Sequence, residues 1–267
     1  MARALRLAEA GRYSTHPNPR VGCVIVKDGI VVGEGAHLKA GEPHAEVHAL
    51  RSAGAQARGA EVFVTLEPCN HQGRTPPCVD ALVAAGVGKV WAAMTDPNPL
   101  VAGQGLARLQ RAGIATDTGL LQAEAEVLNR GFLMRMRRQR PFITLKLAAS
   151  LDGRTAMASG ESQWITGAAA RADVHRLRAE AGAVLTSSAT VLADNPALTV
   201  REFMAADLRQ PDRIVLDSQR RVPATAAVWS AGARRFWLGA SAPASRPSEV
   251  EALTVETTAE GTISLPR

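Results

Sequence analysis

The stretch EPCNHQGRTPPC, residues 67–78, holds two of the three cysteines in this 267-residue chain. The β-branched run EVFVTL at 61–66 comes before it and predicts a strand. The run PCVDALVAAG at 77–86 overlaps its end and predicts a helix. The two cysteines therefore flank a strand-to-helix connection. Thiols in such a place form a disulfide clip, a redox pair or a metal site. The surrounding sequence has to distinguish among these three possibilities.

Strands and helices alternate on both sides of this connection. Further strands are predicted at 21–26, 30–35, 89–94 and 114–119, and further helices at 44–57 and 105–113. This alternation favours a layered α/β domain.

A helical stretch at 120–140 ends at Pro141, and a second alternation then begins. It consists of a predicted strand at 142–150, a helix at 168–181, and β-rich runs at 184–190 and 212–218. We therefore expect two domains, at 1–142 and 143–267.

The composition limits the possible classes of protein. Hydrophobic residues make up 46% of the chain, which is enough for a buried core, and aromatic residues only 4%, so that core must be mostly aliphatic. The chain has neither an apolar run long enough for a membrane span nor the features of a signal peptide, and three cysteines do not make a disulfide framework, so we expect a cytoplasmic protein. The net charge of +6 fits a solvated Arg-rich surface or an anionic ligand, either nucleic acid or a small phosphorylated compound.

His44 suggests that the two cysteines belong to a metal site. His44, Cys69 and Cys78 offer one imidazole and two thiolates, which is a zinc donor set with a fourth position left for water, as in catalytic sites. Pro77 suits the first position of a helix, which would place Cys78 in the first turn. We expect the positive helix end to lower the pKa of that thiol.

Glu46 follows His44 by two residues, in HAEVH, so the zincin pattern HExxH is absent. A histidine, a glutamate two positions on and a later Pro-Cys instead match the signature of zinc deaminases, in which a metal-activated hydroxide attacks a ring carbon and the glutamate is the general acid and base. His48 and Cys23 are predicted to be packing residues.

The cysteines are eight residues apart, where most deaminases have about two. With this spacing, the chain resembles the bifunctional deaminase–reductases of riboflavin biosynthesis. The resemblance runs from about residue 1 to at least residue 220. It rests on HAEVHAL, TLEPCNHQGRTPPC, DPNPLVAGQGLARLQRAGI at 96–114, KLAASLDGRTAMASGESQWITG at 146–167 and LTSSATVLADNPALTVR at 185–201. It implies a cytidine-deaminase-like three-layer domain followed by a partial dihydrofolate-reductase-like α/β domain.

For the first domain, the resemblance implies zinc held by His44, Cys69 and Cys78, with Glu46 as proton shuttle. The implied substrate is a phosphoribosylated diamino-pyrimidinone, and the implied binding residues are Asn18, His71, Arg74, Asp96 and Asn98. An arginine fork suits a phosphate. The motif DPNP at 96–99 lines the pocket on this interpretation and is a plain turn on the alternative one.

For the second domain, the resemblance implies reduction of the opened ribose by NADPH. The implied cofactor contacts are Ala148, Trp164, Thr190, Asp194 and Ser218. The implied contacts to the sugar phosphate are Ser162, Arg178, Leu198 and Arg201. A Rossmann fold is not predicted, because the chain has no G-x-G-x-x-G fingerprint after a strand.

The family pattern weakens toward Arg267. Family members carry a Glu-Gly-Gly or Glu-Ala-Gly turn and further strands beyond this point, and AEGT at 259–262 follows no apolar strand. We expect residues 240–262 to form surface loops with one weak strand, and the reductase half to be shortened and of doubtful activity.

Two other functions remain open at this point. One is a deaminase of tRNA or single strands, which needs a flipped-base pocket. The other is a non-enzymatic zinc-stabilised module with His71 as a fourth ligand. The favoured interpretation implies a small phosphoribosyl-pyrimidine as the partner, no nucleic acid, no membrane and a possible homo-oligomer.

Overall fold

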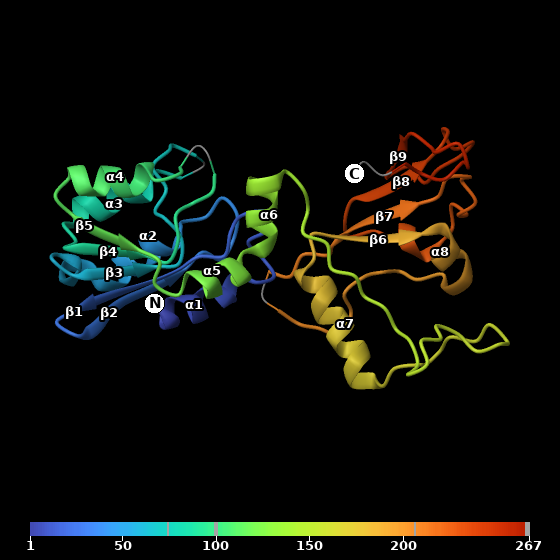
Figure 1. Ribbon diagram of the computed structural model, residues 1–267, viewed down its shortest axis with the longest axis horizontal. Helices are drawn as coiled ribbons and strands as arrows, with labels where there is room; N and C mark the ends of the chain where they lie inside the picture. Colours follow the sequence, from blue (N-terminus) through green and yellow to red (C-terminus); the bar gives the residue numbers. More distant parts are fainter. Residues whose placement is uncertain (74, 99–100, 206, 265–267) are drawn as a thin grey trace. The chain divides into compact units, whose positions relative to one another are not determined.

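The computed structural model describes residues 1–73, 75–98, 101–205 and 207–264. The chain divides into two compact units, Met1–Leu145 and Lys146–Arg267. Each unit has a sheet of its own (Figure 1).

The sheet of the first unit has the strand order β2-β1-β3-β4-β5. β1 pairs antiparallel with both of its neighbours, whereas β3, β4 and β5 run parallel. The bounds are β1 Gly22–Lys27, β2 Ile30–Ala36, β3 Glu61–Val64, β4 Lys89–Ala92 and β5 Ala115–Thr118. Because the carboxyl ends of parallel strands meet at one edge of a sheet, the loops after β3 and β4 are brought together there.

Helices cover both faces of this sheet, which makes three layers (Figure 1). α2 and α3 lie on one face with α4, over a core that includes Ile25, Val62, Leu82 and Leu109. α1 and α5 lie on the other face, over Leu66 and Met94. The bounds are α1 Ala2–Ala8, α2 Ala45–Ala53, α3 Cys78–Ala85, α4 Gln104–Arg111, α5 Gln122–Leu128 and α6 Arg130–Arg138, with 3-10 turns at Glu9–Gly11 and Gly54–Ala57.

Glycines let α2 lie very close to β2. A Cβ on Gly35 would overlap the carbonyl oxygen of Ala45 and lie 2.6 Å from the amide nitrogen of Ala49, and Gly33 approaches the same helix in the same way. On the opposite face, a Cβ on Gly22 would overlap the backbone of α1. Two successive layers therefore pack backbone against backbone, and this fixes the position at which α2 begins.

The helix predicted at 120–140 is two helices, α5 and α6, which meet at Asn129. The Asn129 side chain is buried and binds the backbone of Arg20 twice: its Oδ1 accepts from the Arg20 N–H at 2.8 Å, and its Nδ2 donates to the Arg20 carbonyl at 2.9 Å. This tertiary contact holds Asn129 at φ −111° and ψ 21°, outside helical geometry, so the helix breaks there.

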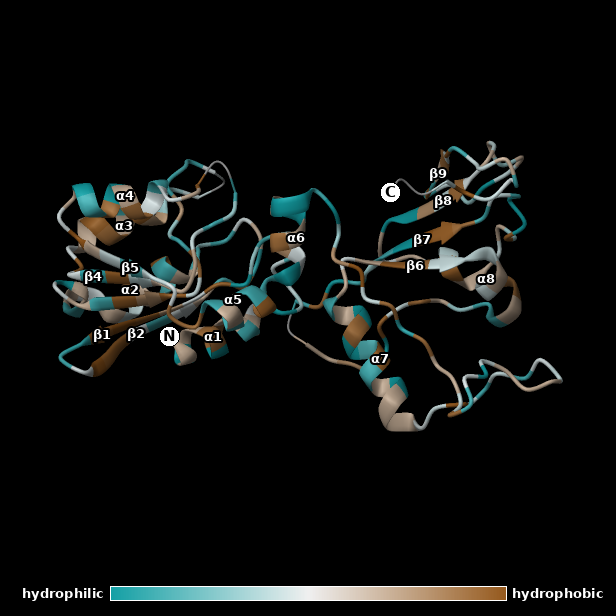
Figure 2. Cartoon of the chain, in the orientation of Figure 1, coloured by the Kyte–Doolittle hydropathy of each residue, from teal (hydrophilic) through white to brown (hydrophobic). Residues whose placement is uncertain are grey.

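The second unit has a sheet of order β6-β7-β8-β9, and all of its strands are parallel. The bounds are β6 Ala183–Ser187, β7 Asp212–Leu216, β8 Arg235–Gly239 and β9 Val250–Thr254, with α7 at Ala168–Glu180, α8 at Ser188–Asp194 and a 3-10 turn at Ala227–Trp229. Val215, Val228 and Trp237 lie in its core. Figure 2 shows the apolar character of β7, as expected for a strand inside a parallel sheet.

One expectation for the second half was wrong, and a second was right only in part. The run 142–150 alternates like a strand but forms none: Ile143 and Leu145 are 80% and 79% exposed. A strand needs a neighbour for its backbone groups, and the described residues supply no ladder partner to this run. In the run 184–190, the residues up to Ser187 belong to β6 and the rest belong to α8. The helix begins there because the Ser187 side chain accepts a hydrogen bond from the N–H of Thr190 and caps it.

The weak strand expected within 240–262 is β9. Among the described residues, every helix is too short or too polar to cross a membrane.

The close approach of α2 to β2 predicts the effect of Gly35→Ala. The added methyl would push against the backbone of Ala45, so the free energy of unfolding should fall by about 1–3 kcal/mol, measured by denaturant titration. Gly131→Ala is the matched control, because Gly131 is helical and has open space around it. That change should instead raise stability by about 0.4–1 kcal/mol. Equal effects of the two changes would contradict this account of the packing.

Candidate metal centre

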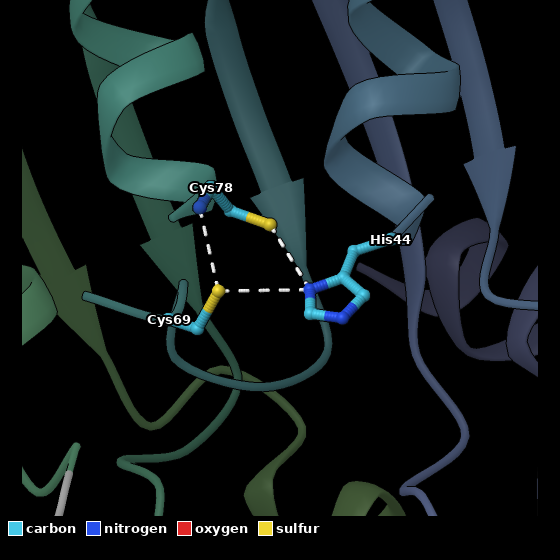
Figure 3. Close-up of side chains that lie close together, drawn as sticks. All are labelled: His44, Cys69 and Cys78. Atoms are coloured by element: carbon cyan, nitrogen blue, oxygen red, sulfur yellow. Dashed lines mark hydrogen bonds between the residues drawn. The ribbon is translucent and has the colours of Figure 1, made fainter. Parts of the chain in front are cut away.

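His44, Cys69 and Cys78 come together from three separate elements (Figure 3). His44 is the residue before the first turn of α2, Cys78 is the first residue of α3, and Cys69 lies in the loop after β3. The Nδ1 atom of His44 is 3.2 Å from the Cys78 sulfur and 3.6 Å from the Cys69 sulfur. All three donor atoms lie within 4.8 Å of one another.

These distances fit a tetrahedral zinc ion. With bonds of about 2.0–2.1 Å to nitrogen and about 2.3 Å to sulfur, a tetrahedral site places a nitrogen and a sulfur donor about 3.6 Å apart. The three residues therefore supply three protein ligands that already face a common point. The structure thus brings together the three residues that the sequence singled out. Pro77, expected as the first residue of the helix, is instead the cap residue that precedes it.

The second nitrogen of His44 also has a partner. Its Nε2 lies 3.4 Å from the Oγ1 of Thr75, which belongs to the loop between the two cysteines. With a metal ion on Nδ1, the ring proton would sit on Nε2, from which it would be donated to Thr75. Metal-binding histidines commonly donate their other N–H in this way, because the bond fixes the ring and the tautomer. The long loop between the cysteines thus contributes to the orientation of the imidazole.

The two thiols share one negative charge. A hydrogen bond from Cys78 lowers the pKa of Cys69 to about 4, against the effect of burial, and His44 and the backbone N–H of Cys78 lower it further. The same bond to Cys69, together with burial and the nearby Glu46, raises the pKa of Cys78. The bond to Cys69 and burial thus outweigh any lowering of the Cys78 pKa by the helix end. A divalent cation would allow both sulfurs to ionise, which is the chemistry that this donor set favours.

Glu46 lies in the first turn of α2, only 3% exposed. Burial raises its pKa to about 7, the charge of Cys69 raises it as well, and His44 and a hydrogen bond from Cys78 lower it. A carboxyl with a pKa near neutrality can both accept and release a proton, as a general acid and base must do.

Asp96 and Asn98 follow β4 at the same edge of the sheet. Asp96 is 8% exposed, and its Oδ1 accepts a hydrogen bond from the N–H of Asn98 at 2.8 Å. Burial raises the pKa of Asp96 to about 6, against that hydrogen bond, and the charge of Glu67 raises it further, whereas His71 lowers it. His71 itself lies in the inter-cysteine loop and is exposed, and Arg74 lies outside the described residues.

Asn18 is positioned by a histidine that the sequence did not single out. The Nδ2 of Asn18 lies 3.2 Å from the Nε2 of His37, and the Nδ1 of His37 lies 3.3 Å from the carbonyl of Pro43. Burial lowers the pKa of His37, which favours a neutral ring that donates to Pro43 and accepts from Asn18. The His37 ring also stands edge-on to His44, with ring centres 5.1 Å apart. Nothing in the sequence near His37 distinguishes it, because these contacts are all tertiary.

In the second unit, Arg178, Leu198 and Arg201 gather around Thr199. Arg178 donates to the carbonyl of Thr199 at 3.3 Å, and Arg201 donates to its hydroxyl at 3.2 Å. The charge of Arg201 adds to burial in lowering the pKa of Arg178. His175, which the sequence did not suggest, accepts from the N–H of Arg201 at 3.3 Å. Two guanidinium groups held near each other would be stabilised by an anion.

The other residues expected in this unit are more scattered. Ser162 lies 3.5 Å from Asp194, which ends α8. Trp164 is 69% exposed and lies under the guanidinium of Arg171. Thr190 lies in the first turn of α8, Ser218 follows β7, and Ala148 belongs to the run that forms no strand.

Two family models match the chain. One, the cytidine and deoxycytidylate deaminase zinc-binding region, matches residues 1–94, and the other, the RibD C-terminal domain, matches residues 141–265. These matches confirm the fold class expected from the sequence.

Curated relatives and solved structures agree with the family models. The riboflavin biosynthesis protein RibD of Escherichia coli is 67% identical over 232 residues, which is 83% of this chain and 63% of that protein. A RibD structure from Acinetobacter baumannii is 50% identical, with a TM-score of 0.88, over 96% of this chain and 73% of that one. A Thermotoga maritima structure, described as a diaminohydroxyphosphoribosylaminopyrimidine deaminase/5-amino-6-(5-phosphoribosylamino)uracil reductase, is 39% identical, with a TM-score of 0.90, over 97% and 74%.

The chain spans 63% of the length of the Escherichia coli relative, and the two structural matches cover nearly three quarters of each solved chain. Both halves of the chain match, in the same order and at high identity. The chain therefore belongs to the RibD family of riboflavin biosynthesis proteins.

Proposed function

We propose that the first unit catalyses the zinc-dependent hydrolytic deamination of 2,5-diamino-6-hydroxy-4-(5-phosphoribosylamino)pyrimidine. The observation that carries this proposal is the three-donor site of His44, Cys69 and Cys78 with the buried carboxyl of Glu46 two residues from the imidazole ligand. Three protein ligands leave one position open for catalysis. The Thermotoga maritima relative, which is described as a deaminase and reductase of this substrate class, supports the choice of substrate.

In this reaction a zinc ion supplies the Lewis acidity that makes water nucleophilic at neutral pH. The protein's own residues do the remaining work. His44, Cys69 and Cys78 would hold the metal, and Thr75 would fix the plane of the imidazole. Glu46 takes the proton from the attacking water and delivers it to the departing amine, which leaves as ammonia.

Asn18, Asp96 and Asn98 are proposed to hold the polar edges of the pyrimidine, with His71 and Arg74 toward the ribose phosphate. Asn18 is pre-oriented by His37, and Asn98 is tied to Asp96. A polar site whose members already bond to one another loses less entropy when the substrate binds. A small phosphorylated pyrimidine also accounts for the basic composition without a nucleic-acid partner.

For the second unit, we propose binding of NADPH and of the opened ribose phosphate for reduction of the sugar. The pair Arg178 and Arg201 supports a phosphate site, because both guanidinium groups lie against Thr199. Leu198 and Ser162 complete the proposed sugar-phosphate set. Ala148, Trp164, Thr190, Asp194 and Ser218 remain the proposed contacts to the cofactor.

Removal of a ligand tests the metal site. Cys78→Ser should abolish stable zinc binding, because serine is a poor zinc donor, and ammonia release should be lost with it. The wild-type protein should contain about one zinc ion per chain by elemental analysis, and a chelator used together with a reductant should remove its activity reversibly. Cys23→Ser is the control, since it makes the same change at a cysteine of β1 that is not one of the three donor residues. Full activity in zinc-depleted protein would contradict the proposal.

Glu46→Gln separates metal binding from proton transfer. Glutamine keeps the size of the side chain but cannot exchange the proton, so kcat for ammonia release should fall by about 10²–10⁴-fold. The zinc content should stay that of the wild type. A variant that keeps both its zinc and its full activity would rule out the proton-transfer role.

Arg201→Gln tests the phosphate site of the second unit. Loss of a charge-assisted hydrogen bond should weaken binding of ribose 5-phosphate by about 10- to 100-fold, measured by titration calorimetry, which requires no turnover. Arg176→Gln is the matched control, because Arg176 lies on α7 as Arg178 does but pairs with Asp173 and Glu180. The control should bind as the wild type does, and equal weakening in both variants would argue against a specific site.

A further inference from the structure

Glu67 is a buried carboxylate next to the metal-ligand loop, and the proposed reaction gives it no role. It follows β3, precedes Cys69 by two residues and is 3% exposed. Its own N–H donates to the carbonyl of Met94 at 3.0 Å, which ties the chain after β3 to the chain after β4. A carboxylate at such depth is costly unless hydrogen-bond donors surround it.

Four backbone N–H groups surround the carboxylate. Its Oε2 accepts from Asp96 at 3.0 Å and from Gly103 at 2.9 Å. Its Oε1 accepts from Gly105 at 2.9 Å and from Leu106 at 3.3 Å, both in the first turn of α4. Four N–H donors match the acceptor capacity of one carboxylate, and two of them come from the N-terminal turn of α4.

The four donors come from three places in the chain, namely Asp96, Gly103 and the first turn of α4. Asp96 and Gly103 stand at the two ends of the connection from β4 to α4, and a single oxygen binds both. The second oxygen binds the helix that follows. Glu67 therefore closes the connection that carries Asp96 and Asn98, and it does so from a position two residues away from Cys69.

Gly105 shows how close this approach is. A Cβ there would overlap the carbonyl oxygen of Pro68 and lie 3.2 Å from the Oε1 of Glu67. Only glycine therefore allows the first turn of α4 to lie against the residue that precedes Cys69. Asn70, on the other side of Cys69, accepts from Arg108 of the same helix at 2.9 Å.

We propose that Glu67 is a positioning residue of the deaminase site. It sets the loop of Asp96 and Asn98 at a fixed place relative to the metal ligand Cys69, and it acts on substrate binding through that loop. This inference rests on the proposed deaminase function, because Asp96 and Asn98 are its substrate contacts. Glu67 itself is not one of the proposed metal or substrate contacts.

Glu67→Gln tests this role with little change in size. The amide has one acceptor oxygen, and its NH2 group would face two N–H donors, so the loop should lose its fixed position. KM for the diamino-pyrimidine substrate should rise by about 10- to 100-fold, the range expected for lost charge-assisted hydrogen bonds. The zinc content should stay that of the wild type, and kcat should change less than KM.

Leu109→Ala is the stability control. Leu109 is fully buried on α4 in the core, away from the loop, so its truncation weakens the packing of the same helix. It should lower Tm and leave KM unchanged. If Glu67 served only to stabilise α4, the two variants would raise KM alike, and that result would overturn the inference.

A double-mutant cycle with Asn98→Ala adds a second readout. If Glu67 acts through this loop, the KM of the double variant should be no higher than that of the worse single variant. Additive effects on KM, or an unchanged KM in Glu67→Gln, would overturn the inference while the deaminase function stands. A zinc-loaded wild-type protein that releases no ammonia would overturn both. If Glu67→Gln does not accumulate folded, Glu67→Asp, which keeps the charge but is too short to reach α4, takes its place with the same expected outcomes.

Discussion

Backbone contact between α2 and β2 determines the position of two residues of the candidate metal centre, His44 and Glu46. The helix rests on the glycines of β2 without intervening side chains, so its first turn has one available position along the strand. His44 and Glu46 are fixed there, at the end of the sheet where β3 delivers Cys69 and α3 begins with Cys78. The loops after the parallel strands complete the site, as expected where such strands end.

Negative charge accumulates at this end of the sheet. Four acidic groups belong to this region: Cys69, Glu46, Asp96 and Glu67. The three carboxyl residues are each less than one-tenth exposed. These four groups differ in how many hydrogen-bond donors compensate their charge. Glu67 is surrounded by N–H groups, whereas burial keeps the pKa of Glu46 near 7 and the thiols share a proton. The groups that lack such donors lie at the candidate metal centre.

The sequence predicted the parts that depend on local patterns. Strands β1 to β5, the fold class and the donor set follow from β-branched runs, a His-x-Glu motif and the cysteine spacing. It could not predict what depends on contacts between distant segments. Asn129 breaks a good helix pattern because it binds Arg20, and Thr75 and His37 matter because of the histidine and asparagine that they touch. The run 142–150 has the local pattern of a strand, but pairing requires a partner that sequence alone does not supply.

The shared proton of Cys69 and Cys78 has a consequence for the handling of the protein. A thiolate with a pKa near 4, hydrogen-bonded to a second thiol, is the form of cysteine that peroxides attack first. Cys69 and Cys78 are also two thiols held side by side. Once one sulfur is oxidised to a sulfenic acid, it can condense with the other to a disulfide. A bound metal ion would protect both sulfurs from this oxidation. Purification in chelating buffers without a reductant therefore risks a loss that added zinc alone does not reverse.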